Sequence, residues 1–229
     1  CMTRLRVSVK DIATVGSESD WKKAGAMGLV KKNKGVQAVY GPKADVLKSD
    51  IQDVLSSNAP IPESKLDRTS EVTSEDTVEG KELIQTVATG EIVSITEVND
   101  EVFAQKMMGD GFAVYPSDKT VVSPVDGTVV STFPTKHAIG LKTDNGLEVL
   151  VHMGIDTVEL NGEGFEVFVK EGQEVKAGDK LAEMALDSIK AAGKDTAIMV
   201  VFTNLSDKQT FELTEMDNVT VSTEIGRIQ

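Results

Sequence analysis

The sequence predicts a mainly β protein, an antiparallel sandwich or barrel preceded by a small α/β segment. Two observations support this fold class. Short runs rich in Val and Ile alternate with Gly, Asn and Asp turn residues throughout 81–229, and many short strands with regular turn signals are typical of sandwiches and barrels. Strand and helix patterns are instead mixed in residues 1–57, as expected of a small α/β unit.

The α/β segment, 1–57, shows both periodicities in turn. Polar and apolar residues alternate at its start, which is the pattern of a half-buried strand. Its last helix would place five apolar residues on one face. The expected elements are a strand over 3–9, a helix over 20–26 with Ser19 or Asp20 as N-cap and Gly28 as its stop, a strand over 36–40 ended by Gly41 and Pro42, and a helix over 44–55.

Residues 58–80 are expected to be a flexible linker. Two prolines open this stretch, and Ser, Thr, Glu and Asp dominate the rest, so it cannot bury enough apolar surface to offset its ordering entropy. The β domain follows over 81–229. Its expected elements include strands over 90–93, 120–122, 127–130, 147–151 and 197–202, a short helix over 186–192, and two loosely similar turn-and-strand segments over 123–131 and 170–181.

Charge and composition exclude several functions. The net charge of -13 disfavours nucleic acid as a partner, because phosphate backbones require a basic surface. Residues 1–57 nevertheless carry 10 basic and 6 acidic side chains, against 14 and 31 in the remainder, which suggests two modules of opposite charge. A single cysteine, Cys1, excludes an internal disulfide and a thiolate zinc cluster.

No transmembrane or secretory segment is expected. No apolar run approaches the roughly 20 residues that span a bilayer, and the start of the sequence shows no basic-then-apolar pattern that resembles a signal peptide. We therefore expect a cytoplasmic protein. The chain starts with Cys1 inside a predicted strand and without an initiator methionine, so it is expected to be a piece of a longer protein.

The two histidines, His137 and His152, are the main candidates for chemistry. The turn signal 143–146 separates them. A hairpin centred on Asp144 and Asn145 would pair residues whose numbers sum to 289, so the two imidazoles would face each other about 5 Å apart. A three-residue loop would shift this sum by one and separate them onto opposite faces, unless Gly146 acts as a bulge that restores the register.

Facing histidines are compatible with three interpretations. A neutral imidazole is a good nucleophile toward phosphorus, and its neighbour could donate a hydrogen bond to the phosphoryl oxygens. The pair could instead bind zinc with a third ligand, or both could be ordinary partly buried residues.

Other candidate sites are weaker. The glycine-rich run 161–165 lacks the Lys-Ser/Thr of a phosphate loop and is expected to be a tight β connection. The β hairpins are also reminiscent of biotinyl and lipoyl carriers, but the required lysine motif is not evident. Cys1 precedes Arg4 and Arg6, which share one face of a strand. Two guanidinium groups near a thiol would lower its pKa and could hold a phosphoryl group, whereas the alternative is a chance terminal cysteine.

Residues 120–181, and above all the segment LVHMGIDTVELNGEGF, closely resemble the IIA domain of the glucose-type sugar phosphotransferase system. The resemblance covers about 81–229. Residues 1–11 and 35–45 resemble the end of the matching IIB domain, whose earlier helix and strand are missing here. The resemblance implies a barrel-sandwich IIA fold, a truncated IIB segment over 1–57 and a type-1 IIA domain over 81–229.

The resemblance also implies a role for individual residues. His152 would accept a phosphoryl group from the phosphocarrier protein HPr and pass it to the IIB cysteine. The remaining residues are His137, which binds that group; Thr135, which hydrogen-bonds His137; Asp100 and Asp156, acidic residues that meet HPr; Val102, Phe103, Met107, Met108 and Val158, an apolar docking patch; Cys1, the phosphocysteine; and Arg4 and Arg6, the transfer arginines.

The partners implied are HPr as donor, the IIB and IIC permease components, a sugar reached through the permease, and regulatory proteins that bind the apolar face. No cofactor and no metal are required by the motif. The identity of the sugar is not encoded here, because sugar selection belongs to the IIC membrane domain.

Overall fold

The computed structural model describes residues 4–26, 28–32, 35–40, 82–206, 208–214 and 216–229. The chain divides into two compact units, Cys1–Thr77 and Val78–Gln229. The helix expected over 44–55 and the linker expected over 58–80 lie outside the described residues.

The N-terminal unit contains a three-stranded antiparallel sheet of order β1-β3-β2. Its small core consists of Leu5, Ala26 and Ala38, with Trp21, Leu29 and Tyr40 packed against them. Its elements are β1 (Arg4–Ser8), the 3₁₀ helix η1 (Ile12–Thr14), α1 (Glu18–Lys23), β2 (Gly28–Lys32) and β3 (Gly35–Val39).

The boundaries expected for α1 were wrong. Its N-cap is Ser17, whose hydroxyl accepts from the backbone N–H of Asp20, while the Asp20 carboxylate accepts in return from the backbone N–H of Ser17. This capping box satisfies two N–H groups that the first turn leaves open, so the helix begins two to three residues earlier than expected. Gly28 does not stop the helix but begins β2, a strand that the sequence analysis missed.

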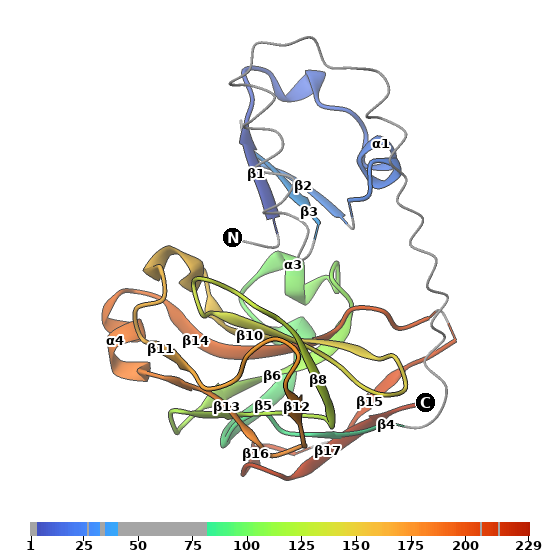
Figure 1. Cartoon of the computed structure of the whole chain (residues 1–229). Helices are drawn as coiled ribbons and strands as arrows, with labels where there is room; N and C mark the ends of the chain where they lie inside the picture. Colours follow the sequence, from blue (N-terminus) through green and yellow to red (C-terminus); the bar gives the residue numbers. More distant parts are fainter. Residues whose placement is uncertain (1–3, 27, 33–34, 41–81, 207, 215) are drawn as a thin grey trace. The chain divides into compact units, whose positions relative to one another are not determined.

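The C-terminal unit is a mainly antiparallel β structure, as predicted. It is built on an eight-stranded sheet of order β12-β8-β9-β10-β14-β6-β5-β16, with two three-stranded sheets, β11-β13-β7 and β15-β17-β4, packed with it (Figure 1). The strands are β4 (Glu82–Gln85), β5 (Gly90–Ser94), β6 (Asp110–Pro116), β7 (Thr120–Val122), β8 (Gly127–Thr132), β9 (Ala138–Lys142), β10 (Glu148–Ile155), β11 (Phe165–Val167), β12 (Glu174–Val175), β13 (Lys180–Met184), β14 (Asp195–Phe202), β15 (Phe211–Leu213), β16 (Asn218–Val219) and β17 (Glu224–Ile228).

Among the described residues of this unit, four short helices connect the strands. They are the 3₁₀ helices η4 (Ile95–Glu97) and η5 (Thr157–Leu160) and the α-helices α3 (Glu101–Ala104) and α4 (Leu186–Ala191). The last of them confirms the helix expected over 186–192.

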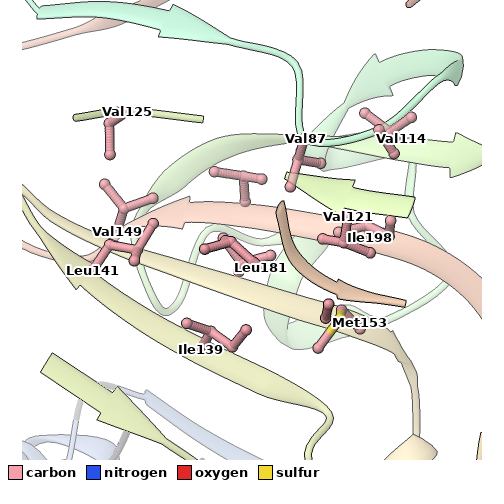
Figure 2. Packing of buried hydrophobic residues seen from close by; sticks show 14 of the residues in the cluster. Val87, Val114, Val121, Val125, Ile139, Leu141, Val149, Met153, Leu181 and Ile198 are labelled. Carbon is pink, nitrogen blue, oxygen red and sulfur yellow. The ribbon is translucent and has the colours of Figure 1, made fainter. Parts of the chain in front are cut away.

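Aliphatic side chains fill the core between the sheets (Figure 2). Alternate residues of β10, Val149, Val151 and Met153, belong to this cluster, and so do Ile139 and Leu141 of the neighbouring β9. Burying one such side chain contributes roughly 1.5–3 kcal/mol. Because side chains alternate along a strand, the residues between them lie on the other face of the sheet.

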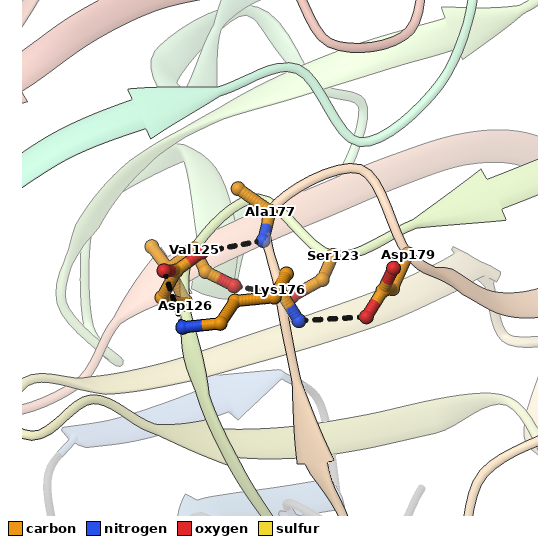
Figure 3. A network of polar contacts seen from close by, with 6 residues as sticks. All are labelled: Ser123, Val125, Asp126, Lys176, Ala177 and Asp179. Carbon is orange, nitrogen blue, oxygen red and sulfur yellow. Dashed lines mark hydrogen bonds and ion pairs between the residues drawn. The ribbon is translucent and has the colours of Figure 1, made fainter.

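Two turns from distant parts of the sequence are bonded to each other (Figure 3). The Asp126 carboxylate accepts from the backbone N–H of Ala177 at 2.8 Å and from Lys176 Nζ at 3.0 Å. These bonds lower the pKa of the Asp126 carboxyl. Backbone bonds between Ser123 and residues 178 and 179 complete the contact. The turns precede β8 and β13, and they belong to the two segments that resemble each other in sequence.

Candidate functional site

His152 lies in the middle of β10, at the centre of the large sheet. It is paired with Ala138 of β9 on one side and Met199 of β14 on the other. Its neighbours Val151 and Met153 face the core, so its own side chain lies on the opposite face. Paired strands on both sides hold the backbone of His152 in place.

The hairpin before His152 has a different register from the one expected. The turn is closed by a bond from Gly146 N–H to the Thr143 carbonyl, and Gly146 has a φ of +85°. Thr143 N–H also donates to the Leu147 carbonyl at 2.9 Å, so three residues, 144–146, form the loop, a common hairpin type with a left-handed glycine. Paired residues in β9 and β10 sum to 290, as in Ala138 with His152, and not to 289. Gly146 does not restore the expected register.

The two imidazoles nevertheless meet. Their ring centroids lie 4.9 Å apart with an interplanar angle of 81°. β9 begins at Ala138, and Lys136, just before His137, has a left-handed φ of +54°. The His137 carbonyl still accepts from Met153 N–H at 2.7 Å. The chain thus changes direction before β9, and this change brings the ring of His137 to His152.

Thr135 lies two residues before His137 and bonds to its ring. Thr135 Oγ1 is 2.7 Å from His137 Nδ1. Burial and the neighbouring His152 lower the pKa of His137 to about 3, so the ring is neutral near pH 7 and carries one ring hydrogen. If the threonine hydroxyl donates to Nδ1, that hydrogen must be on Nε2. The His137 Nε2 atom is buried and has no hydrogen-bond partner among the described residues.

The low pKa of His137 makes the fold sensitive to acid. The ring titrates near 6.5 in the unfolded chain and near 3 in the folded one, so below pH 6.5 the unfolded state binds more protons. The contribution of His137 to stability is therefore fully present above pH 6.5, and we expect it to fall by about 1 kcal/mol per pH unit toward pH 3.

Urea unfolding of the wild type and of His137→Gln, followed from about pH 7 to about pH 4.5, checks this expectation. The glutamine does not titrate, so acid should destabilise the wild type more steeply than the variant. Equal pH dependence of the two proteins would contradict the lowered pKa.

Aromatic rings surround the histidine pair. The Phe103 ring lies 5.2 Å from the His152 ring, at 62°, and the Phe133 ring lies 5.6 Å from the His137 ring, at 55°. Asp100 caps α3 through bonds to the N–H groups of Val102 and Phe103 and so orients this helix. Sequence reasoning missed Phe133, although its position four residues before His137, in the same turn, was a usable signal.

The residues expected to form the docking patch come from two segments. One is α3 and the turn after it, where Val102, Phe103 and Met108 are each 1% exposed and Asp100 and Met107 are partly buried. The other is η5, where Asp156 precedes the helix with a left-handed φ of +57° and Val158 is partly buried. Phe103 is the member of this set whose ring contacts His152.

Gly154 and Thr157, which sequence reasoning also missed, shape the end of β10. The register of β10 with β14 shifts between Met153 and Ile155, and Gly154 there has a φ of +79°. A Cβ at Gly154 would lie 2.3 Å from Thr157 Cγ2. The buried Thr157 hydroxyl donates to the Met153 carbonyl at 2.6 Å. This bulge fixes η5 beside the strand that carries His152.

The described part of the chain does not contain a cluster of side chains that could bind a metal ion. No group of three or more His, Cys, Asp and Glu side chains there is close enough to hold one ion. A zinc ion on His137 and His152 would therefore take its further ligands from elsewhere. The glycine run 161–164 forms the connection from η5 to β11, as expected of a tight β link.

The N-terminal candidates are only partly described. Arg4 and Arg6 occupy alternate positions on β1, and Cys1 lies outside the described residues. Within the described ranges, no helix has the length and apolar character needed to cross a membrane.

Comparisons with known proteins agree on one family. The family model described as the phosphoenolpyruvate-dependent sugar phosphotransferase system, EIIA 1, matches residues 82–208. The whole chain is 53% identical to 32% of a glucose-specific EIICBA component from Streptococcus pneumoniae. Over 91% of its length it is 43% identical to 32% of a glucosamine-specific EIICBA component from Bacillus subtilis. The chain thus spans about a third of the length of these relatives.

A solved structure extends the match to the fold. The glucose permease IIA from Mycoplasma capricolum superposes with a TM-score of 0.61 and 40% identity, covering 65% of this chain and 96% of that one. The share matched corresponds in size to the large β unit.

Proposed function

The chain belongs to the EIIA 1 family of the phosphoenolpyruvate-dependent sugar phosphotransferase system, and on that premise we propose that His152 carries the phosphoryl group. The observation that supports this assignment is the contact between the two imidazoles, 4.9 Å apart, with His137 buried, neutral and bonded to Thr135. Proteins of this family are phosphoryl carriers that work with HPr and with IIB and IIC components.

His152 is the nucleophile in this proposal. A nitrogen of its neutral imidazole attacks the phosphorus of phospho-HPr, and the bond from phosphorus to the donor breaks as the new N–P bond forms. The paired strands hold the backbone of His152, and the rings of Phe103 and His137 contact its imidazole, so that positioning supplies most of the catalysis. The IIB cysteine then takes the group in a second in-line step.

His137 stabilises the transferred group. With the Thr135 hydroxyl donating to Nδ1, the Nε2–H of His137 is the donor available to a phosphoryl oxygen. Such a donor is most effective where water is excluded and the charge is not screened. The rings of Phe103 and Phe133 supply apolar surroundings for the pair, and they slow hydrolysis of the phosphohistidine by keeping water away.

Docking and location complete the proposal. Asp100 and Asp156 would meet a basic surface of HPr. Met107 and Val158, which are partly buried, would form the accessible apolar part of the contact, and the buried Val102, Phe103 and Met108 would support it from within. The strong negative charge of the chain favours encounter with a basic partner. We infer a cytoplasmic location, where HPr and the permease components are met.

The N-terminal unit is proposed to be the end of a IIB domain, over 1–57, joined by a linker over 58–80 to the IIA domain over 81–229. Two relatives that carry IIB and IIA parts in one chain match nearly all of this sequence. Cys1 would be the phosphocysteine, and Arg4 and Arg6 would bind the phosphoryl group. The identity of the sugar is not assigned, because one relative is named for glucose and the other for glucosamine.

Phosphorylation in a reconstituted system tests the function. The chain is incubated with phosphoenolpyruvate, enzyme I and HPr, and added phosphate is located by intact mass and peptide mapping. We expect one acid-labile phosphate on His152, and a further one on Cys1 if the IIB part is active. An unmodified His152 in the presence of phosphorylated HPr would refute the proposal.

A further inference from the structure

In the register of β9 with β10, His137 falls at a position whose side chain would lie on the opposite face of the sheet from His152. Residues of β9 that share the parity of 137, Ile139 and Leu141, face the core, and so does Met153, to which the His137 carbonyl is bonded. If β9 continued straight back by one residue, the imidazole of His137 would also enter the core face. The observed contact with His152 therefore needs a local departure from strand geometry.

Lys136 supplies that departure. Its φ of +54° lies in the left-handed region, which is uncommon for a residue with a side chain. Its N–H donates to the Phe133 carbonyl at 2.7 Å, which closes a tight turn over 133–136. The side chain itself is exposed. The position thus contributes through its backbone conformation, while its side chain is in solvent.

The glycine run that resembled a phosphate loop lies against this turn. A Cβ placed on Gly162 would lie 3.7 Å from Lys136 Cδ and 3.8 Å from the carbonyl oxygens of Pro134 and Thr135. Gly162 has a φ of +93°, where a side chain is strained. The run 161–164 therefore passes within ordinary van der Waals distance of the turn that carries Thr135 and His137.

We propose that Lys136 is a positioning residue for phosphoryl transfer and that it acts through its left-handed backbone. This conformation turns the imidazole of His137 out of the alternation of β9 and onto the face of His152. The inference rests on the proposed function and deepens it, because it explains how the second histidine reaches the first in a register that should separate them.

Two substitutions separate the backbone from the side chain. Lys136→Asn and Lys136→Val both remove the charge and the long chain at an exposed position. Asparagine adopts the left-handed region readily, whereas a β-branched residue there is an outlier. We expect Lys136→Asn to pass phosphate from His152 to a IIB cysteine at close to the wild-type rate. We expect Lys136→Val to be slower by about tenfold, because its chain populates the aligned conformation less.

The readouts distinguish positioning from general damage. Both variants should accept phosphate on His152 from phospho-HPr, and the thermal midpoints of the large unit should stay close to each other. Nitrogen NMR of the ring should show the wild-type tautomer of His137 in Lys136→Asn and an altered pattern in Lys136→Val. Equal transfer rates in the two variants, or an equal loss in both, would overturn the backbone role. A wild type that takes no phosphate on His152 would instead refute the proposed function itself.

Discussion

His152→Ala is expected to take up no phosphate at all. The variant lacks the nucleophile, and the remaining imidazole, His137, is a poor substitute, because with the Thr135 hydroxyl donating to Nδ1 its Nε2 carries the ring hydrogen and neither nitrogen has a free lone pair. Loss of the attacking group removes the covalent route altogether. Intact mass is measured after incubation with phosphoenolpyruvate, enzyme I and HPr. The variant should keep the mass of the unmodified chain, with no acid-labile phosphate on histidine.

Val151→Ala is a suitable control for this loss. It changes the adjacent residue of the same strand, but on the core face, so it lowers stability by about 1–3 kcal/mol without touching the nucleophile. We expect it to be phosphorylated wherever it is folded. Phosphate on another histidine of His152→Ala, in an amount equal to the wild type, would show that His152 is not the carrier.

His137→Ala is expected to separate the two transfer steps. His152 should still accept phosphate, because the paired strands hold its backbone and the Phe103 ring, which the substitution leaves in place, still contacts its imidazole. Onward transfer to a IIB cysteine should fall by roughly 10²–10³-fold, the usual cost of removing one preorganised donor to a charge that develops in the transition state. Single-turnover transfer from the isolated phospho-form measures this second step directly.

His137→Gln is the matched variant for this prediction. Its amide can still offer an N–H group in place of Nε2–H, so it should retain more onward transfer than His137→Ala. The rate of onward transfer in Thr135→Val should lie between those of the wild type and His137→Ala. This variant keeps the ring of His137 but removes the hydroxyl that fixes its tautomer. Normal onward transfer in His137→Ala would remove the second histidine from the mechanism.

The large β unit was predictable because its signals are local. Alternating runs such as 127–130 and 147–151 became β8 and β10, and the 186–192 pattern became α4. Turn chemistry also pointed to the hairpin between the histidines. Each of these features depends on neighbours within a few residues, where propensity and periodicity carry most of the information.

The parts that could not be predicted depend on backbone geometry or on distant contacts. The hairpin register depended on whether Asn145 or Gly146 is the last residue of the loop. A shift of one residue moves every side chain of the strand to the opposite face of the sheet. The left-handed Lys136 has no composition signal, because lysine rarely adopts this conformation. The bond between Asp126 and Ala177 joins segments 51 residues apart, beyond the reach of local patterns.

The central place of β10 in the large sheet also restricts the order of events. His152 has a paired strand on each side and the core behind it, so a macromolecule can reach its ring from one side only. A donor and an acceptor protein would each need that same side. They must therefore take turns, with the first product leaving before the second substrate arrives, which is a ping-pong scheme in which an excess of either protein inhibits its counterpart.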